Sequence, residues 1–286
     1  MKKQQYIESL INVSHAIGNN PAYMQGGGGN TSVKINQNLM LIKSSGTNLK
    51  EMSETQGQNT VDFIKINSFL NERQVDEESF TKKINSFSQS KTDRPSIETG
   101  FHSILGKFVI HTHSVFVNVF LCSKQGREII KELFPDSLWI NYWSPGKNLT
   151  LAIKKELERE KLRFSGEKII FLQNHGLIVS SHSGELALKL HEYINNKIKT
   201  SFDLTEFKVV SSFDKKIENV LFPDQVVYLG EKDYSLSQAA KETLSAYYYI
   251  EQEMSNLNLS PNYLSKTDIN KITHMESEKF RKSLVK

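Results

Sequence analysis

The stretch 108–113 reads FVIHTH and places His111 and His113 at the end of an apolar run. Alternate side chains of a β-strand point to one face, which brings these two imidazoles together with Cβ atoms roughly 6–7 Å apart. Two imidazoles at that spacing can bind one metal ion through bonds of about 2.0–2.1 Å. The stretch therefore predicts a buried strand that carries part of a metal site, although the pair alone also fits ordinary polar residues at a strand end.

A third histidine strengthens this prediction. His175 lies in a loop directly after the apolar run 169–172, and functional side chains gather in such strand-end loops. Three neutral imidazoles with an open fourth position are typical of a catalytic zinc site, whereas structural zinc sites favour cysteine. Because the chain has a single cysteine, we predict that His111, His113 and His175 bind one divalent ion per subunit, zinc or another metal.

Two loops of small residues are candidates for binding an anion. The glycine block 26–29 lets backbone amides approach an anion closely, and consecutive amides can form an anion-binding concavity. It lacks the lysine ending of a Walker loop, so a flexible turn is the plain alternative. A hairpin over 30–43 would bring the loop 44–47 close to it, and Lys34 and Lys43 could add charge. Together the two loops could clasp one phosphate.

Glu98 is the candidate acid or base. It lies in the first turn of an expected helix over 97–105, with Ser96 as a plausible N-cap. An acid near a helix N-terminus interacts favourably with the helix dipole, so its position alone favours a structural role. Its function therefore has to be argued from the other motifs.

The periodicity of apolar residues predicts an α/β protein, in which helices flank a central sheet. We expect helices over 6–17, 97–105, 149–160, 183–202, 237–257 and 266–283. We expect strands over 30–35, 39–43, 60–66, the start of 108–121, 139–143, and 168–173 continued by 177–180. The run 71–91 reads as an exposed excursion, and 220–229 as a loop and strand.

The bulk composition limits the class of protein. The 286 residues include 36 basic and 32 acidic side chains, a net charge of +4, and the two signs alternate along the chain. A nucleic-acid binder would concentrate basic residues on one face, so we expect no nucleic-acid partner. No run approaches the roughly 20 apolar residues of a membrane span, and the N-terminus lacks the apolar core of a signal peptide. With one cysteine, these features predict a cytoplasmic protein with no membrane partner.

Taken together, five segments resemble the class II aldolase/adducin family, which includes fuculose-phosphate and rhamnulose-phosphate aldolases. They are Gly28-Gly29-Asn30-Thr31-Ser32, Ser44-Ser45-Gly46, Pro95-Ser96-Ile97-Glu98 followed by Phe101-His102, His111-Thr112-His113, and Asn174-His175-Gly176. Their order and approximate spacing match the family. The resemblance implies a three-layer fold with a central, mainly antiparallel sheet in a catalytic domain over 1–205, followed by a mainly helical extension over 206–286.

The resemblance also implies roles for individual residues. It assigns one zinc ion to His111, His113 and His175, and the acid/base function to Glu98. It assigns phosphate binding to the following residues: Gly29, Asn30, Ser45, Gly46 and Ser96. The chain departs from the family pattern in the short interval of 13 residues from Glu98 to His111, and in Ile97, where some family aldolases have a serine.

The implied function is that of a zinc-dependent lyase in carbohydrate metabolism. It would cleave or form a ketose phosphate through a metal-stabilised enediolate and give dihydroxyacetone phosphate and an aldehyde. A decarboxylase or epimerase of a sugar or sugar-acid phosphate, and an adducin-like scaffold without activity, are the alternatives. The resemblance further implies a homo-oligomer, with a tetramer favoured and sites near subunit interfaces, where Tyr142 or Tyr247 of a neighbour could protonate the aldehyde oxygen.

Overall fold

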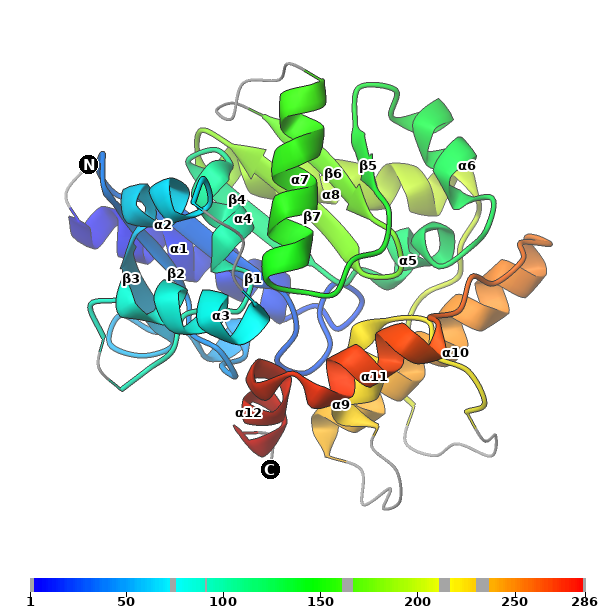
Figure 1. The fold of residues 1–286 in the computed structure, drawn as a ribbon. Coiled ribbons are helices and arrows are strands. Elements are labelled where there is room, and N and C mark those ends of the chain that lie inside the picture. Colours follow the sequence, from blue (N-terminus) through cyan, green and yellow to red (C-terminus); the bar gives the residue numbers. More distant parts are fainter. Residues whose placement is uncertain are drawn as a thin grey trace.

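The computed structural model describes residues 3–72, 76–90, 92–160, 167–210, 217–229 and 237–284. Within these residues, seven strands form one sheet in the order β3-β2-β1-β4-β7-β6-β5 (Figure 1). The strands are β1 Asn30–Lys34, β2 Leu39–Lys43, β3 Gln58–Asp62, β4 Phe108–Thr112, β5 Leu138–Ile140, β6 Lys168–Leu172 and β7 Gly176–Ser181. Every neighbouring pair is antiparallel except β5 with β6, which confirms the predicted mainly antiparallel sheet.

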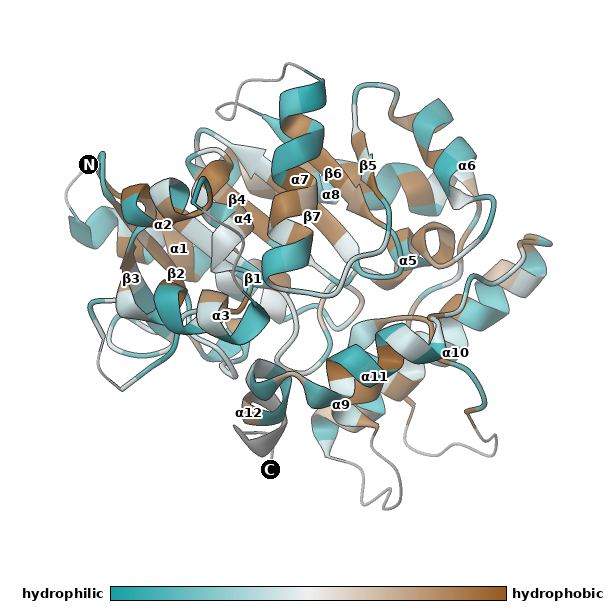
Figure 2. Cartoon of the chain, viewed as in Figure 1, coloured by the Kyte–Doolittle hydropathy of each residue, from teal (hydrophilic) through white to brown (hydrophobic). Residues whose placement is uncertain are grey.

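Helices cover both faces of the sheet and form the two outer layers of the fold. On one face lie α1 Lys3–Gly18, α5 Val115–Leu121 and α8 Gly184–Ser201, with α6 Gly126–Leu133 and a short 3-10 helix Leu49–Glu51 at the edges. The other face carries α2 Phe63–Phe69, α3 Glu77–Ser86, α4 Thr99–Ile104 and α7 Lys147–Arg159. Figure 2 shows hydrophobic residues concentrated on the central strands between these layers. The predicted three-layer α/β fold is therefore confirmed.

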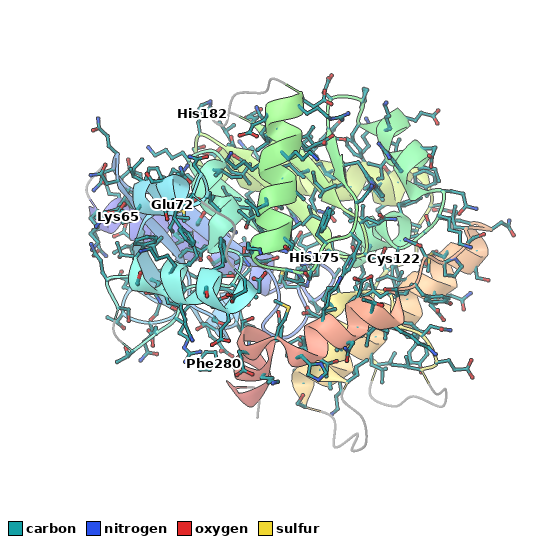
Figure 3. All side chains as sticks on the ribbon, viewed as in Figure 1. Lys65, Glu72, Cys122, His175, His182 and Phe280 are labelled. Atoms are coloured by element: carbon teal, nitrogen blue, oxygen red, sulfur yellow. The ribbon has the colours of Figure 1, made fainter. Side chains whose placement is uncertain are left out.

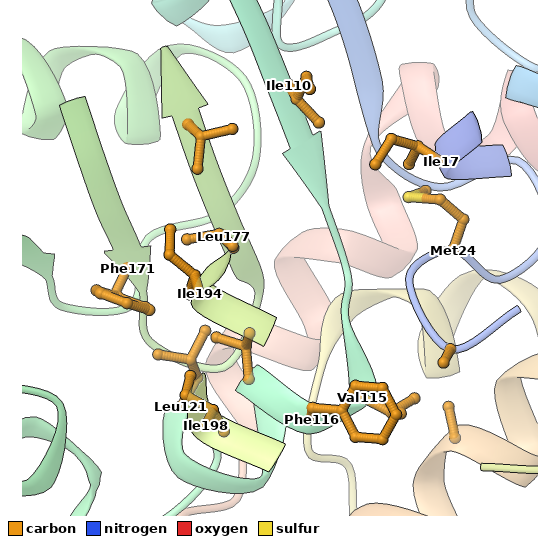
Figure 4. Packing of buried hydrophobic residues seen from close by; sticks show 14 of the residues in the cluster. Ile17, Met24, Ile110, Val115, Phe116, Leu121, Phe171, Leu177, Ile194 and Ile198 are labelled. Atoms are coloured by element: carbon orange, nitrogen blue, oxygen red, sulfur yellow. The ribbon is translucent and has the colours of Figure 1, made fainter. Parts of the chain in front are cut away.

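The central strand β4 shows how the alternation of side chains places the candidate ligands. Phe108 and Ile110, the latter labelled in Figure 4, belong to the hydrophobic core on the face of α1, α5 and α8, whereas Val109 belongs to the core on the opposite face. By the same alternation, His111 lies on the Val109 side. Thr112 lies on the other side, where its hydroxyl oxygen is 2.9 Å from Nε2 of His191 in α8. The two-residue period thus points the histidine of β4 away from α8.

The C-terminal part of the chain packs against the edge of this domain. It contains α9 Pro223–Tyr228, α10 Gln238–Asn256, α11 Lys266–His274 and α12 Glu276–Leu284. These helices lie together below the sheet in Figure 1, and α10 packs against α5. Residues of α10 such as Tyr247 and Ile250 share one hydrophobic core with the sheet. The extension is mainly helical, as predicted, and none of the described helices is both long and apolar enough to cross a membrane.

Several expected elements were wrong. The strand expected over 60–66 ends at Asp62, whose side chain accepts a hydrogen bond from the backbone N–H of Lys65 and caps α2. The segment 177–180 does not continue the preceding strand, because the chain reverses at 174–175 and β7 pairs antiparallel with β6.

Three more expectations also failed. The predicted excursion over 71–91, of which 73–75 and 91 lie outside the described residues, contains α3, which buries Phe80 and Ile84. The loop and strand expected over 220–229 is the helix α9, which begins with a proline. The single helix expected over 266–283 is divided at Met275, whose backbone is extended.

Candidate metal and anion site

The three predicted histidines meet in one place. His111 lies on β4, and His113 follows the end of that strand. His175, labelled in Figure 3, lies in the turn between β6 and β7. Their ring centroids are 4.9–5.0 Å apart, and one nitrogen of each lies within 4.8 Å of the others. All three side chains are buried. The antiparallel pairing of β4 with β7, and of β7 with β6, is what brings His175 to the other two.

Hydrogen bonds fix the orientation of two of the rings. Nδ1 of His111 lies 3.1 Å from the carbonyl oxygen of Leu177, and Nδ1 of His113 lies 2.7 Å from Oδ2 of Asp224. A carbonyl and a carboxylate can only accept, so both Nδ1 atoms donate, and in the neutral form of each ring Nε2 then keeps a lone pair. These two Nε2 atoms are 3.2 Å apart, close to the roughly 3.3 Å expected between two nitrogens on one tetrahedral zinc ion. Two lone pairs at that distance repel unless a cation lies between them.

The protonation of the rings also fits a metal. Burial lowers the pKa of His111 to about 4, against the opposing effect of Glu98, and lowers the pKa of His175 to about 3 for the same reason. Both imidazoles are therefore neutral at neutral pH, which is the form that binds a metal ion. Nδ1 of His175 has no hydrogen-bond partner among the described residues.

Glu98 faces the same point from the side of α4. Its Oε2 lies 3.4 Å from Nε2 of His111, and its Oε1 lies 3.4 Å from Nε2 of His175. Burial acts to raise the pKa of Glu98, but the three neighbouring imidazoles and a hydrogen bond from Asn30 outweigh it and lower the pKa to about 2. Oε1 has no hydrogen-bond partner among the described residues. A buried carboxylate and three imidazole nitrogens that converge on one point suit a divalent cation such as zinc.

Asn30 and Ser96, predicted to bind phosphate, also hold Glu98. The Asn30 amide donates to Oε2 of Glu98 at 2.8 Å and to the hydroxyl oxygen of Ser96 at 3.0 Å. Its carbonyl oxygen contacts Nε2 of His102, whose Nδ1 lies 2.7 Å from the Ser32 hydroxyl oxygen. The predicted N-cap role of Ser96 was wrong, because the helix begins at Thr99 with Glu98 at the N-cap. His102 is thus a buried structural histidine that orients the Asn30 amide.

A small pocket joins the metal side to the two loops. Eight of the nine predicted site residues line it: Gly29, Asn30, Ser45, Gly46, Ser96, Glu98, His113 and His175. The ninth, His111, lies behind Glu98 at the distance given above. The loop 44–47 is also held against residues 94–96, because Ser45 N–H donates to the Arg94 carbonyl and Ser96 N–H donates to the Lys43 carbonyl.

The two lysines weighed for the anion site have different positions. Lys43 lines the pocket, and its ammonium donates to the carbonyls of Gly27 at 2.9 Å and Thr47 at 2.7 Å, so it joins the two loops. Lys34 instead donates to the Leu105 carbonyl and lies over the ring of Phe63, and burial lowers its pKa to about 8. Of the two, Lys43 is the one that brings positive charge to this pocket.

Two acidic residues of the pocket were missed in the sequence. Asp224 of α9 and Glu278 of α12 both line it, at 1% and 4% exposed. A local signal for α9 existed, since Pro223 and Asp224 suit the first positions of a helix. Neither residue lies in a motif that resembles the family. The tyrosines weighed as proton donors, Tyr142 and Tyr247, are not among the described residues that line this pocket.

The comparisons with known proteins agree with this architecture. The family model described as "Class II Aldolase and Adducin N-terminal domain" matches residues 8–202, so the chain belongs to the class II aldolase and adducin family. Among curated proteins, it is similar to the uncharacterized oxidoreductase YuxG of Bacillus subtilis (strain 168), with 26% identity over 211 residues. That match covers 67% of this chain and 30% of YuxG, so the chain spans less than a third of that relative.

Solved structures show the same fold. The N-terminal class II aldolase domain of a conserved protein from Thermoplasma acidophilum matches with a TM-score of 0.60 and 24% identity, over 70% of this chain and 95% of that chain. YgbL from Klebsiella pneumoniae, a proposed aldolase/epimerase/decarboxylase, matches with a TM-score of 0.52 and 19% identity, over 73% of this chain and 93% of that chain. At these identities the likeness concerns the fold.

Proposed function

We propose that the protein is a zinc-dependent lyase that cleaves a ketose phosphate to dihydroxyacetone phosphate and an aldehyde, or forms it from these two compounds. The observation that carries this proposal is the convergence of the Nε2 atoms of His111 and His175 on the two oxygens of Glu98, each at 3.4 Å. The Nε2 atom of His113 lies 3.2 Å from that of His111. A metal ion bound there would act as a Lewis acid toward the substrate carbonyl.

Glu98 is the group we assign to the proton transfer. Its pKa near 2 keeps it ionised, so in the direction of synthesis it can accept a proton from the carbon next to the carbonyl. In cleavage the hydroxyl that becomes the aldehyde loses its proton as the carbon–carbon bond breaks, and Glu98 in its protonated form gives a proton to that carbon. The hydrogen bond from Asn30 fixes the carboxylate at the pocket, which positions it for the transfer.

The phosphate would be held at the opposite end of the pocket. We assign this to the side chains of Ser45 and Ser96 and to the backbone of Gly29, Asn30 and Gly46, with Lys43 beside the loops. Gly46 has φ of 80°, a left-handed conformation that favours glycine and turns backbone amides in a way that suits an anion. Binding the remote phosphate would orient the reacting carbons at the metal side.

The quaternary structure and location belong to the same proposal. A homo-oligomer, with a tetramer favoured, is consistent with the family, and a neighbouring subunit would supply the group that protonates the aldehyde oxygen. The cytoplasmic location predicted from the sequence stays part of this proposal.

The decisive experiment is a substrate panel with metal-defined protein. The zinc-loaded protein, the protein stripped with a chelator, and the stripped protein reloaded with zinc are each incubated with ketose phosphates and sugar-acid phosphates. We expect aldehyde release from a ketose phosphate only in the two loaded samples. Release of carbon dioxide without an aldehyde would favour the decarboxylase instead, and failure of the protein to bind zinc would reject the lyase.

A further inference from the structure

One candidate metal ligand, His113, is hydrogen-bonded to a carboxylate that lies outside the family domain. Oδ2 of Asp224 accepts from Nδ1 of His113 at 2.7 Å, and both side chains are buried, at 1% and 4% exposed. Asp224 lies in the first turn of α9, after Pro223, and 111 residues along the chain from His113. The matched family domain ends at residue 202, so this carboxylate belongs to the C-terminal extension.

The glycine block leaves room for this pair. A Cβ atom built on Gly28 would lie 2.5 Å from Oδ2 of Asp224 and 2.8 Å from Nδ1 of His113. Real Cβ atoms do not approach polar atoms that closely, so any side chain here would force the two groups apart. Gly28 does not have a positive φ, so the reason for glycine at this position is space. One of the motif residues therefore serves the contact between His113 and Asp224.

A second contact fastens the same extension to the loop of His175. Asn174, in the left-handed conformation with φ of 54°, donates from its amide to the carbonyl oxygen of Leu221 at 2.8 Å and to that of Asn262. Its own side-chain oxygen accepts from the Asn262 amide at 2.9 Å. The backbone on both sides of α9 and α10 is thus bonded to the residue that precedes a candidate ligand. These bonds help to hold α9 in the position in which Asp224 contacts His113.

We propose that Asp224 is a positioning residue of the metal centre: its carboxylate fixes the tautomer and rotation of His113 so that Nε2 points at the metal. The C-terminal extension thereby completes a site whose three imidazoles come from the family domain. Carboxylate partners of metal-binding histidines raise the basicity of the ligand, and their loss costs about 10–100-fold in metal affinity. This inference rests on the metal centre of the proposed function and not on the identity of its substrate.

The test measures zinc affinity directly. Zinc is titrated into the apo-protein in competition with a chelating dye, for wild type, Asp224→Asn, Gly28→Ala and Glu253→Gln. Asp224→Asn keeps an acceptor oxygen and the packing but removes the charge. Gly28→Ala places a methyl group against Asp224 and His113 and pushes them apart. Glu253 is the matched control, a carboxylate of α10 that is 3% exposed and accepts from Thr205 and Asn256.

We expect the zinc dissociation constant to rise about 10–100-fold in Asp224→Asn and Gly28→Ala and to stay within twofold of wild type in Glu253→Gln. Cobalt substitution adds a spectroscopic readout, because the visible absorption of bound cobalt should change in the first two variants and not in the control. In the zinc-loaded wild type, a strongly deshielded Nδ1 proton of His113 in the proton NMR spectrum is expected, which does not depend on any variant folding.

Three results would overturn the proposal: an unchanged dissociation constant in folded Asp224→Asn, an equal rise in Glu253→Gln, or the absence of the deshielded His113 proton. A wild-type protein that does not take up zinc would overturn both this inference and the proposed function. A protein that shows the expected affinities but cleaves no ketose phosphate would support the role of Asp224 and reject the proposed substrate.

Discussion

The two halves of the pocket are built in different ways. The metal half, His111, His113, His175 and Glu98, lies at the ends of strands and at the N-cap of a helix. Hydrogen bonds fix the rings of His111 and His113 and one oxygen of Glu98. The anion half, Lys43, Ser45, Gly46, Ser96 and Glu278, comes from loops and from α12. It also places the Glu278 carboxylate in a pocket that we propose for a phosphate. The metal half is preorganised for one ligand, whereas the charge of the anion half is mixed.

Replacing Glu98 by Gln tests the metal half most strongly. The amide keeps the shape of the side chain but cannot accept the transferred proton, so we expect turnover to fall about 100–10,000-fold. Zinc should remain bound, since the three imidazoles are intact. Steady-state kinetics and metal analysis of the same sample check this, with Glu253→Gln as a buried control in the extension. Unchanged turnover would reject the assigned role of Glu98.

The acid stability of the protein reports on the packing behind the metal half. Burial lowers the pKa of His191, which contacts Thr112 of β4, to about 3. The folded state therefore binds fewer protons than the unfolded state between pH 3 and the usual histidine pKa of 6.5. The free energy of unfolding that neutral His191 contributes is fully present above pH 6.5. It is lost as the pH falls toward 3, by about 1.4 kcal/mol per pH unit, or about 2 kcal/mol at pH 5.

Denaturant titrations at pH 7 and pH 5 measure this loss. In His191→Gln the difference in unfolding free energy between the two pH values should shrink by about 2 kcal/mol, even if the variant is less stable at pH 7. His182, which lies next to Ser181 at the far end of β7 and is exposed, provides the control. An equal pH dependence in wild type and His191→Gln would contradict the assigned cause.

Ser45→Ala tests the anion half. The loss of one hydrogen bond to a charged phosphate should cost about 1.5 kcal/mol, which raises KM about tenfold with little change in kcat. Ser137, whose hydroxyl donates to the Phe134 carbonyl away from the pocket, gives the matched control Ser137→Ala. A fall in kcat at constant KM would show instead that Ser45 acts on the reacting atoms.

Glu278→Gln should have the smallest effect and the opposite sign. Removing a buried negative charge from the anion half reduces repulsion of a phosphate, so we expect KM to fall a few-fold, about 0.5–1 kcal/mol. Inhibition by inorganic phosphate, measured in parallel, should tighten by a similar factor. If phosphate binds more weakly in the variant, Glu278 supports the anion site through the residues around it, and the charge of the anion half does not oppose phosphate.

The sequence predicted the elements whose signals are local. The hairpin β1–β2 was found because its strands alternate and a polar turn separates them, and Asn36 does accept from the N–H groups of Asn38 and Leu39. His111 and His113 were found because a two-residue spacing on a strand fixes a shared face. His175 was found because it follows an apolar strand in a loop, and the resemblance to the family gave it the same role.

The residues that were missed act over long separations or against the apolar pattern. Asp224 meets His113 across 111 residues, and no periodicity reports such a contact. The helix α9 was mistaken for a strand because Val226 and Val227 favour strands, but Gln225 caps its start by accepting from the backbone of Leu221 and Phe222. In the same way, the cap at Asp62 overrode the apolar run that follows it.

The separation between His113 and Asp224 also sets an order of events during synthesis. At about 5–20 residues per second, the ribosome needs roughly 5–20 s to make the 111 residues between them. All three imidazoles have been made before the carboxylate that orients His113 exists. A nascent chain that meets zinc early would therefore hold it in a site that still lacks the carboxylate beside His113.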